Sequence, residues 1–437
     1  MKSSRIIFLE KILKYFAVKT LRRFNPRIVG VTGSVGKTST KEAIFTVLSS
    51  KFRVRKNEKN YNNEIGLPLT VLGLETGGGN WTKWLFVMID AVMVTFFHRK
   101  KNYPEALVLE MGADRPGDIK YLVEFLKPEV GVVTTIGISH LEFFEDKKQI
   151  AWEKSTLVKY LRKDGIAILN YDDEEVRKMA ENVTAKKIFY GFFEGADVRA
   201  SDIFFGYEKT EDVRGGDLDK IRGISFKLNY DGASVPVRLV RSVGRPQIYS
   251  ALAAAAVGIH FGMNLLEISE ALKNFQAPLG RLNIIDGVKN TIIIEDSYNS
   301  APQSALAALE VLEKIKARRK LAALGNMLEL GKDMESGHRE VGRKASEVAQ
   351  VLFAVGDKAT FISDEAVKSG MSRENVFEFE NSDEAKKFIQ DKLQEGDVIL
   401  VKGSQGVRME RISEEIMRYP EQAKKLLPRQ TREWGKG

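Results

Sequence analysis

Short apolar runs alternate with amphipathic segments along most of the chain. In the first half, the runs that predict strands are residues 28–31, 106–110, 130–134 and 167–170. In the second half, a helix is predicted at 304–316, and strands are predicted at 291–295, 320–324, 351–355 and 397–401. Runs that are apolar throughout suit strands buried on both faces, as in parallel sheets covered by helices. The pattern therefore predicts an α/β fold with mainly parallel sheets.

The middle of the chain has a different pattern. Residues from about 186 to 243 are aromatic, punctuated by glycine and alternating, which predicts a small β-rich part. Helical spacing returns from 244 to 277, and 278–281 (Pro-Leu-Gly-Arg) is typical of a linker. We therefore expect three parts: residues 1–27, 28–280 and 281–437. The tail from Tyr419 is polar and basic, and we expect it to be partly mobile.

The first 27 residues predict a basic amphipathic helix. Apolar side chains and one threonine recur there at steps of three and four residues: Ile6, Leu9, Leu13, Phe16, Thr20 and Phe24. This segment holds eight Lys or Arg against Glu10, so eight minus one gives +7 of the chain's net charge of +9. The remaining residues are nearly balanced, which argues against a general nucleic-acid-binding surface. Two interpretations stay open: a helix packed on the rest of the protein, or contact with a membrane surface.

A second unusual segment lies at about 77–102. It contains an apolar run from Trp84 to Phe97, interrupted by Asp90, and ends in Arg99, Lys100 and Lys101. The run is too short to span a bilayer, which takes about 20 residues. It follows three glycines and is typical of an insertion, either a buried helix or one that lies in the membrane interface over residues 81–101.

Composition narrows the classes of protein. A chain of 437 residues is long enough for two or three domains with their own cores. It has no cysteine, which excludes disulfides, thiolate metal sites and cysteine nucleophiles and suits a reducing compartment. A cleavable signal peptide is not evident at the start of the sequence.

The chemistry is indicated first by residues 31–40, Val-Thr-Gly-Ser-Val-Gly-Lys-Thr-Ser-Thr. They follow an apolar strand and precede a helical pattern, which is the context of a phosphate-binding loop. Glycines let the backbone wrap a phosphate chain, the lysine reaches the β- and γ-phosphates, and the first hydroxyl after it holds Mg²⁺. The phosphate-contacting residues are therefore predicted to be Gly33, Ser34, Gly36, Lys37, Thr38 and Ser39.

This variant of the loop resembles that of the Mur ligase family, which forms amide bonds at the expense of ATP. Further motifs follow in the family's order, and several resemble its MurF type, which adds D-alanyl-D-alanine to a UDP-muramoyl tripeptide. They are the segments 60–68 (Asn-Tyr-Asn-Asn-Glu-Ile-Gly-Leu-Pro), 110–119, 139–142, 296–302, 324–331 and 401–404. The resemblance implies a central P-loop ATPase domain with the β-rich part as a subdomain. It also implies a C-terminal Rossmann-like α/β domain.

The resemblance also implies a mechanism. ATP phosphorylates a carboxylate, and an amine then displaces phosphate from the acyl phosphate. The implied catalytic residues are Lys37, Asn63, His140 and Lys154, and the implied Mg²⁺ ligands are Thr38, Glu110, His140 and Lys154. Lys154 occupies the place of a family lysine that carries CO₂ as a carbamate. ATP and Mg²⁺ are the implied cofactors.

The C-terminal motifs supply the remaining candidates. For ATP they are Gln247, Arg281, Asp296 and Asn299, with Arg281 meeting the phosphates when the domains close. Lys402 and Ser404 are expected to face the substrate. The family pattern near the adenine is altered, because Pro246 replaces its histidine and Gln247 its first asparagine, while Asn326 stands for a usual aspartate. His338 matches a family histidine and is equally open to a structural interpretation.

The largest departure is before the phosphate loop, where MurF-type enzymes carry a domain for the UDP end of their substrate and this sequence has 27 residues. The favoured hypothesis is a monomeric cytoplasmic ligase that extends a small-molecule or peptide cell-wall precursor, with membrane contact through 1–27 and 81–101 left open. A Mur-family ligase for another acid and amine is one alternative. A non-catalytic membrane-associated scaffold is the other, and the joint retention of Lys37, Thr38, Glu110, His140 and Lys154 argues against it.

Overall fold

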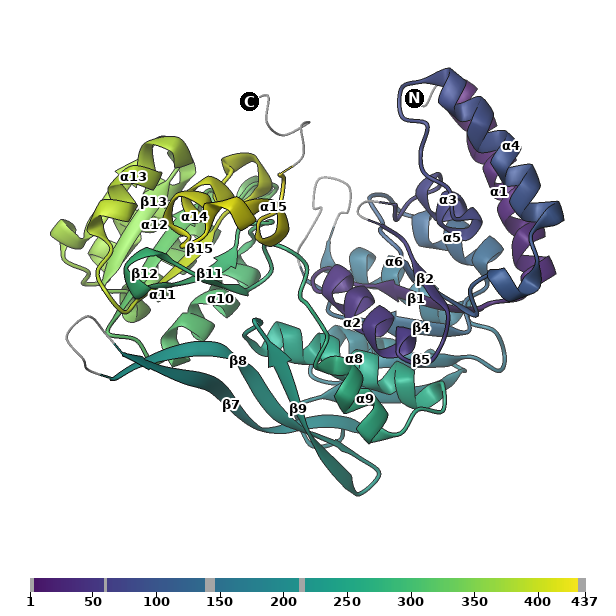
Figure 1. Ribbon diagram of the computed structural model, residues 1–437, viewed down its shortest axis with the longest axis horizontal. Coiled ribbons are helices and arrows are strands. Elements are labelled where there is room, and N and C mark those ends of the chain that lie inside the picture. The colour runs from purple at the N-terminus through teal and green to yellow at the C-terminus, as the bar shows by residue number, and fades with distance from the viewer. Residues whose placement is uncertain (1–3, 59–60, 138–145, 212–216, 431–437) are drawn as a thin grey trace. The chain divides into compact units, whose positions relative to one another are not determined.

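The strands predicted from apolar runs are present in the computed structural model, which describes residues 4–58, 61–137, 146–211 and 217–430 (Figure 1). The chain divides into two compact units. The first comprises Met1–Ser201, Leu228–Val235 and Tyr249–Leu272, and the second comprises Asp202–Lys227, Pro236–Ile248 and Lys273–Gly437. Each unit contains a mostly parallel sheet with helices, so the predicted α/β class is confirmed.

The first unit is built on parallel strands in the order β2-β3-β1-β4-β5-β6. Their bounds are β1 Arg27–Thr32, β2 Val54–Lys56, β3 Ala106–Glu110, β4 Val130–Val133, β5 Ile166–Asn170 and β6 Lys186–Gly191. The helices that follow these strands along the chain are α2 Lys37–Ser49, α5 Asp118–Leu126, α6 Lys147–Lys159 and α7 Glu174–Ala180. Two later helices are α8 Arg245–His260 and α9 Leu265–Leu272. β3, β4 and β5 are buried at every position and are apolar except for Glu110 and Asn170 at the strand ends, as expected of strands covered on both faces.

The sheet continues into the β-rich stretch through β6, which pairs in parallel with β7. The bounds are β7 Val198–Glu211, β8 Asp217–Tyr230 and β9 Ala233–Val240. In β9 exposed and buried positions alternate, as expected of a strand with one face in water.

Three helices form a separate apolar cluster in the first unit: α1 Ser4–Phe24, α3 Gly66–Leu72 and α4 Trp81–Phe97. Figure 1 shows α1 and α4 side by side, and the two helices are in contact. Their shared core contains Leu9, Leu13, Leu69, Leu72, Trp84 and Ala91. No helix within the described ranges is long and apolar enough to cross a membrane.

The second unit has strands in the order β10-β11-β15-β12-β13-β14, all parallel except for β10. The strands are β10 Asn283–Asp286, β11 Ile292–Asp296, β12 Arg319–Gly325, β13 Val351–Val355, β14 Val376–Phe379 and β15 Asp397–Lys402. The helices are α10 Pro302–Lys314, α11 Met334–Val348, α12 Thr360–Lys368, α13 Ser382–Lys392, α14 Glu410–Ile416 and α15 Ala423–Leu426. Alternate residues of β11 belong to different clusters, Ile292 and Ile294 to one and Ile293 to the other, so both faces of the sheet carry a core.

The expectation of a mobile tail from Tyr419 is wrong as far as residue 430. Leu427 is buried in a core cluster, and the buried Arg429 pairs with Glu410 at 2.6 Å. The polar and basic composition suggested mobility, but Arg429 pairs with the buried carboxylate of Glu410 in α14. This ion pair compensates for the cost of desolvating the arginine.

Candidate active site

The phosphate loop joins β1 to α2, and two of its residues need the freedom of glycine. Gly33 has φ 146° and Gly36 has φ 87°. A Cβ at Gly33 would lie 1.9 Å from Thr134 Oγ1, so the close approach of the loop to the end of β4 excludes any side chain there.

Hydrogen bonds hold the loop against the segment after β4. The Ser34 amide donates to Thr135 O at 2.7 Å, and the Ser34 hydroxyl donates to Gly137 O at 3.0 Å. The Thr134 hydroxyl donates to Val35 O at 2.7 Å. The loop is thus fixed from both sides before any ligand binds, which reduces the entropy lost on binding.

Lys37, Thr38 and Ser39 form the first turn of α2. The N-terminal turn of a helix suits an anion, because its backbone N–H groups have no acceptor within the helix itself. The Lys37 ammonium donates to Gly33 O at 2.8 Å and to Ser34 O at 3.2 Å, so it lies over its own loop. A phosphate is a stronger acceptor than these carbonyls because it is charged. The predicted loop residues are therefore together in one anion-binding arrangement.

Lys154 is buried in α6, with 3% of its surface exposed. Burial, with the nearby charge of Lys37 as the second cause, lowers the pKa of Lys154 from 10.5 to about 7, against the opposing effect of Glu153 and Asp114. At neutral pH a large share of this amine is therefore uncharged and nucleophilic. The sequence suggested a surface lysine at this position, and only the family resemblance pointed to a site.

Glu110 ends β3 and is 5% exposed. Its Oε2 atom is buried and has no hydrogen-bond partner among the residues that the structure describes. The nearest cation recorded for it is the ammonium of Lys41, at 3.8 Å. A buried carboxylate oxygen with spare acceptor capacity is costly unless something binds it, and Mg²⁺ prefers oxygen ligands of this kind.

The residues present fit a Mg²⁺ ion at this edge of the sheet. Glu110 offers the unpartnered oxygen, Thr38 offers a hydroxyl in the first turn of α2, and Lys154 would offer oxygens only as a carbamate. Within the described ranges there is no group of three His, Asp or Glu side chains that would hold a metal by itself. His140, the remaining predicted ligand, lies outside the described residues.

Asn63 holds the turn that leads into α3. Its Oδ1 atom accepts from the amides of Ile65 at 3.2 Å and Gly66 at 2.9 Å, next to the start of α3. The neighbouring Asn62 lies against Gly112, where an added Cβ would come within 2.8 Å of the Asn62 amide nitrogen. The catalytic role of Asn63 stays a prediction, and the geometry gives its carbonyl oxygen a structural task.

Three residues that the sequence analysis did not select help to build this edge of the sheet. Asn57 is fully buried and accepts from the Glu110 amide at 2.7 Å, while the Lys41 ammonium donates to Asn57 O at 2.8 Å. Glu153 accepts from the amides of Gly117 at 2.8 Å and Ile119 at 2.7 Å, which ties α6 to the start of α5. The only sequence signal was position, since Lys41 follows Lys37 by one helical turn and Glu153 adjoins Lys154.

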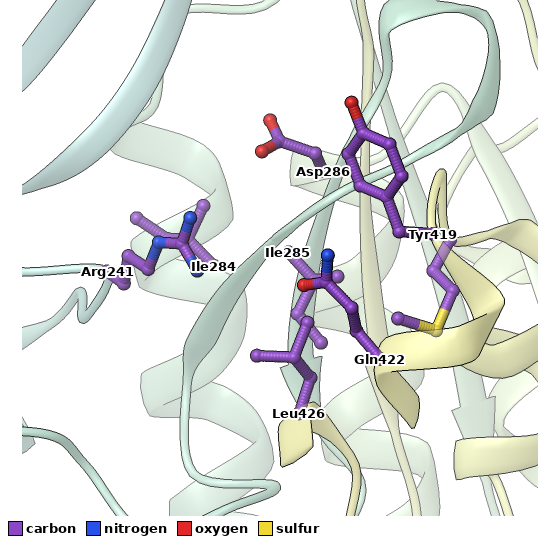
Figure 2. Close-up of a pocket in the computed structure, with 8 residues that line it drawn as sticks. Arg241, Ile284, Ile285, Asp286, Tyr419, Gln422 and Leu426 are labelled. Carbon is purple, nitrogen blue, oxygen red and sulfur yellow. The ribbon is translucent and has the colours of Figure 1, made fainter. Parts of the chain in front are cut away.

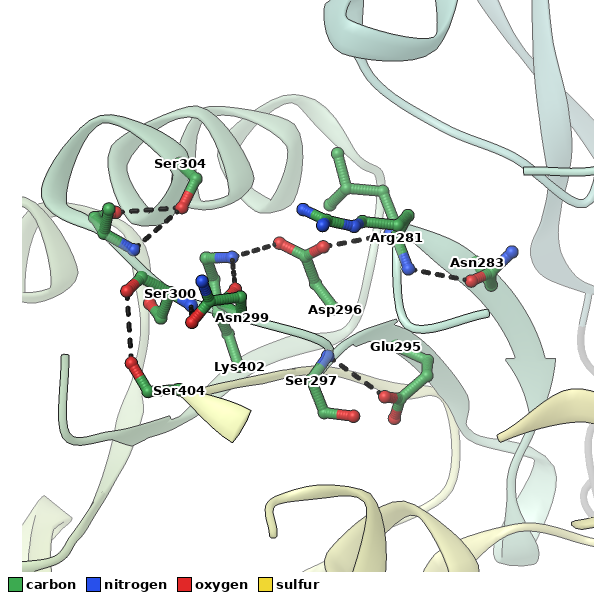
Figure 3. Close-up of polar contacts among 12 residues, drawn as sticks. Arg281, Asn283, Glu295, Asp296, Ser297, Asn299, Ser300, Ser304, Lys402 and Ser404 are labelled. Atoms are coloured by element: carbon green, nitrogen blue, oxygen red, sulfur yellow. Dashed lines mark hydrogen bonds and ion pairs between the residues drawn. The ribbon is translucent and has the colours of Figure 1, made fainter. Parts of the chain in front are cut away.

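In the second unit, Asp296 and Lys402 form a buried ion pair at the ends of the paired strands β11 and β15 (Figure 3). The Lys402 ammonium lies 2.6 Å from Asp296 Oδ2 and donates to Asn299 O at 3.0 Å. Burial lowers the pKa of Lys402, and the ion pair with Asp296 opposes this. The sequence analysis assigned Asp296 to ATP and Lys402 to the substrate, whereas here each is the partner of the other.

Ser404 links three segments of the same unit. Its hydroxyl accepts from the Leu328 amide at 2.8 Å and donates to Ser300 O at 3.2 Å (Figure 3). The structure therefore brings the predicted residues Asp296, Asn299, Lys402 and Ser404 together at one edge of the sheet.

Gln247 and Arg281 are also joined. The Gln247 amide donates from Nε2 to Arg281 O at 2.8 Å, and its Oε1 atom is buried with no partner among the described residues. The Arg281 guanidinium lies over the Tyr298 ring, 4.5 Å from the centroid. The side chain that replaces the family asparagine thus fixes the linker and keeps a free acceptor.

His338 and Asn326 have structural roles. The buried His338 ring accepts from the Met327 amide at 2.9 Å and contacts Met334 O through Nδ1 at 2.6 Å, and burial lowers its pKa. Asn326 Oδ1 accepts from the amides of Lys358 at 3.0 Å and Ala359 at 2.8 Å. The open question about His338 is therefore answered by its packing.

A cavity of about 80 Å³ in the second unit is separate from all of these residues (Figure 2). It is lined by Arg241, Ile284, Ile285, Asp286, Met417, Tyr419, Gln422 and Leu426. Pockets for small organic ligands are typically several times larger, so this cavity does not indicate a substrate site.

Comparison with known proteins agrees with this geometry. The Mur ligase middle domain family matches residues 31–81 and 91–258, and the Mur ligase glutamate ligase domain family matches residues 280–405. The break in the first match, at 82–90, falls inside α4. That part of the helix is therefore not covered by the shared family pattern.

Individual relatives cover most of the chain. The UDP-N-acetylmuramoyl-tripeptide–D-alanyl-D-alanine ligase of Bacillus subtilis is 29% identical, over 93% of this chain and 79% of its own length. The Escherichia coli protein of the same name is 30% identical, over 88% and 76%. Among solved structures, the MurF ligase of Thermotoga maritima in complex with ADP matches with a TM-score of 0.74 and 25% identity, over 95% and 84%.

The family matches, the relatives and the phosphate loop with Glu110 and Lys154 behind it lead to the same assignment. The chain belongs to the Mur ligase family.

Proposed function

We propose that this protein is an ATP-dependent ligase that joins D-alanyl-D-alanine to the peptide carboxylate of a UDP-N-acetylmuramoyl tripeptide. The names of its relatives supply the two substrates. The observation that carries the proposal is the buried Lys154, with its pKa near 7, electrostatically coupled to the phosphate-loop lysine. Burial of a lysine amine in the protein interior is costly, because its charged form loses hydration. A buried amine is therefore a candidate functional group.

The phosphate loop binds and orients the nucleotide. Its backbone N–H groups and the Lys37 ammonium hold the terminal phosphates in line with the attacking carboxylate. Positive charge at this position stabilises the charge that develops on the transferring phosphoryl group. Gly33 and the contacts of Ser34 keep the loop in place while the phosphoryl group moves.

Lys154 is proposed to react with CO₂. Its neutral amine attacks the carbon, a N–C bond forms while one C=O π bond of CO₂ opens onto its oxygen, and the nitrogen releases one proton, so the amine becomes an anionic carbamate. Thr38, Glu110, His140 and this carbamate would hold Mg²⁺. When bound, Mg²⁺ neutralises negative charge on the phosphates and on the acid substrate. A partly uncharged Lys154 supports the carbamate because an ammonium cannot attack CO₂.

The second unit is proposed to contact the nucleotide and the amine substrate. Gln247, Arg281, Asp296 and Asn299 are the nucleotide candidates, and Lys402 and Ser404 face the substrate. We also propose that the enzyme acts in the cytoplasm as a monomer.

The test is phosphate release from ATP with defined substrates. Release should require both the UDP-linked tripeptide and D-alanyl-D-alanine, and mass spectrometry should detect the amide product. Lys154→Ala should lose most of this activity, and a small carboxylic acid such as acetate should restore part of it. Lys148→Ala is the matched control, because Lys148 is an exposed lysine of the same helix. Phosphate release that does not depend on D-alanyl-D-alanine would refute the proposal.

A further inference from the structure

The outward side of α4 carries exposed apolar side chains along its whole length, with the charged Lys83 and Asp90 exposed beside them. Inward positions Trp84, Ala91 and Thr95 are buried against the neighbouring helices. Phe86 and Phe97 on the other side are 65% and 68% exposed. The other exposed apolar residues of this helix are Trp81, Leu85, Ile89, Val92, Met93 and Phe96. Packing against α1 and α3 therefore accounts for only one side of α4.

The adjoining face of α1 adds aromatic and basic side chains. Phe8 and Tyr15 are 64% and 53% exposed, and Lys11, Lys19 and Arg22 are exposed at helical spacing around them. The Lys19 ammonium lies 5.0 Å from the Tyr15 ring centroid and 5.5 Å from that of Phe96 on α4. An open apolar groove runs between the helices, lined by Lys11, Ile12, Tyr15, Phe16, Met88 and Val92. We call this combined surface the α1/α4 face.

Positive charge surrounds the α1/α4 face. Arg99, Lys100 and Lys101 are exposed directly after α4, and Lys83 is exposed in its first turn. The acidic residues of the two helices are Glu10 and Asp90. Asp90 follows Lys83 by seven residues, which places both on the same side of α4. The face is therefore apolar at its centre and basic at its margins.

An exposed apolar surface of this extent is uncommon on a protein that stays in water. A neighbouring protein would bury this apolar surface equally well. The basic residues around it, however, favour an anionic membrane as the partner. Helices that lie in a membrane interface combine apolar and aromatic side chains on one face with Lys and Arg beside them. Because no described helix can cross a bilayer, the helices would lie along its surface.

We propose that the α1/α4 face docks on an anionic lipid bilayer, with the apolar side chains of α4 below the headgroups and the basic residues of α1 and 99–101 among them. The face is built independently of the phosphate loop, so it does not rest on the proposed function. Each basic residue near an anionic surface contributes about 1 kcal/mol, which is about fivefold in the partition coefficient. Added salt weakens that part.

The experiment is co-sedimentation of the full chain with vesicles of phosphatidylglycerol and phosphatidylcholine, at low and high salt. We expect binding to anionic vesicles that falls at high salt. The double variant Phe86→Glu with Phe97→Glu should lose binding, because two charges would enter the apolar layer. Leu266→Glu is the matched control, since Leu266 is 71% exposed on α9, outside the face. It should bind like the unmodified chain.

Circular dichroism and phosphate release separate docking from folding and from catalysis. The double variant should keep its helix content and, with water-soluble substrates, its turnover. If that variant does not fold, Lys100→Ala with Lys101→Ala provides the second test and should reduce binding about 25-fold, at about fivefold per residue. The unmodified chain failing to bind at low salt would overturn the proposal. Equal vesicle binding by the double variant would also overturn it. A further contrary result is a dimer that the double variant abolishes while no form of the chain binds vesicles, because a second copy of the chain would then be the occupant of the face.

Discussion

Replacing Lys154 by methionine should make the protein more stable and at the same time inactive. Methionine has a similar length and no charge, so it fills the same space in α6 without the desolvation of an ammonium. The pKa of Lys154 falls from 10.5 to about 7 on folding. At about 1.4 kcal/mol per pKa unit, this difference corresponds to about 5 kcal/mol of stability at most.

The sign of the pH dependence follows from the protons bound. Above its pKa in the unfolded chain, Lys154 is neutral in both the folded and the unfolded state, so its ionisation does not lower the free energy of unfolding. As the pH falls below 10.5, the unfolded chain takes up a proton that the folded chain does not, so stability is lost until the folded pKa of about 7 is reached. Lys154→Met removes this loss. The variant should be about 3 kcal/mol more stable at about pH 8, about 5 kcal/mol more stable below pH 7, and little different above pH 10.

The assay is urea unfolding of both proteins across this pH range, in buffer free of CO₂ so that the amine stays unmodified. Lys148→Met is the control, because Lys148 is exposed on the same helix, and its effect should not vary with pH. A Lys154→Met difference that stays constant from pH 7 to about pH 10 would refute the burial argument, since it would show that Lys154 protonates alike in both states. A variant that gains stability and loses activity is expected when a functional group, here the buried Lys154 amine, lowers the stability of the folded protein.

The other predictions concern groups held by equally specific contacts. Lys37→Ala should abolish phosphate release and leave the urea midpoint nearly unchanged, because the ammonium donates to carbonyls of its own loop, Gly33 O and Ser34 O; near-normal turnover would contradict this. Asp296→Ala should destabilise the protein by about 3–5 kcal/mol, since it leaves the Lys402 ammonium buried, and Asp296→Leu with Lys402→Met should recover most of that loss in thermal unfolding. Burial raises the pKa of Glu295 from 4.5 to about 7, so its stabilising protonated form is lost as the pH rises through 7. Glu295→Gln should therefore gain about 3 kcal/mol relative to the unmodified chain between about pH 5 and pH 8, and a constant difference would exclude this burial.

The strands that the apolar runs predict could be recognised because nearly all of their residues are buried, in contrast to the alternating β9. A run such as Ile292–Asp296 has no polar alternation, and few structures other than a covered parallel sheet bury it. The phosphate loop was equally readable, because Gly33 and Gly36 are fixed by backbone geometry and by Thr134. Local sequence patterns were therefore sufficient to predict the fold class and the anion-binding loop.

Contacts between distant segments could not be read in this way. Asp296 and Lys402 are 106 residues apart, and their pairing depends on the strand order that places β11 beside β15. The burial of Lys154 was hidden because its flanking residues are polar, and a buried lysine has the same sequence signal as an exposed one. The side-by-side packing of α1 and α4 could not be predicted, because neither amphipathic pattern alone selects its partner.

Gln247 shows how a departure from the family pattern can keep its chemistry. A buried acceptor without a partner costs about 1–3 kcal/mol, so Oε1 of Gln247 is expensive to keep unless a ligand uses it. The other end of the same amide holds Arg281 O, and thereby the linker residue whose guanidinium lies over Tyr298. A nucleotide base that donated to Oε1 would therefore bind to the side chain that fixes the position of Arg281. Binding of the base would then be coupled to the position of Arg281 through one side chain.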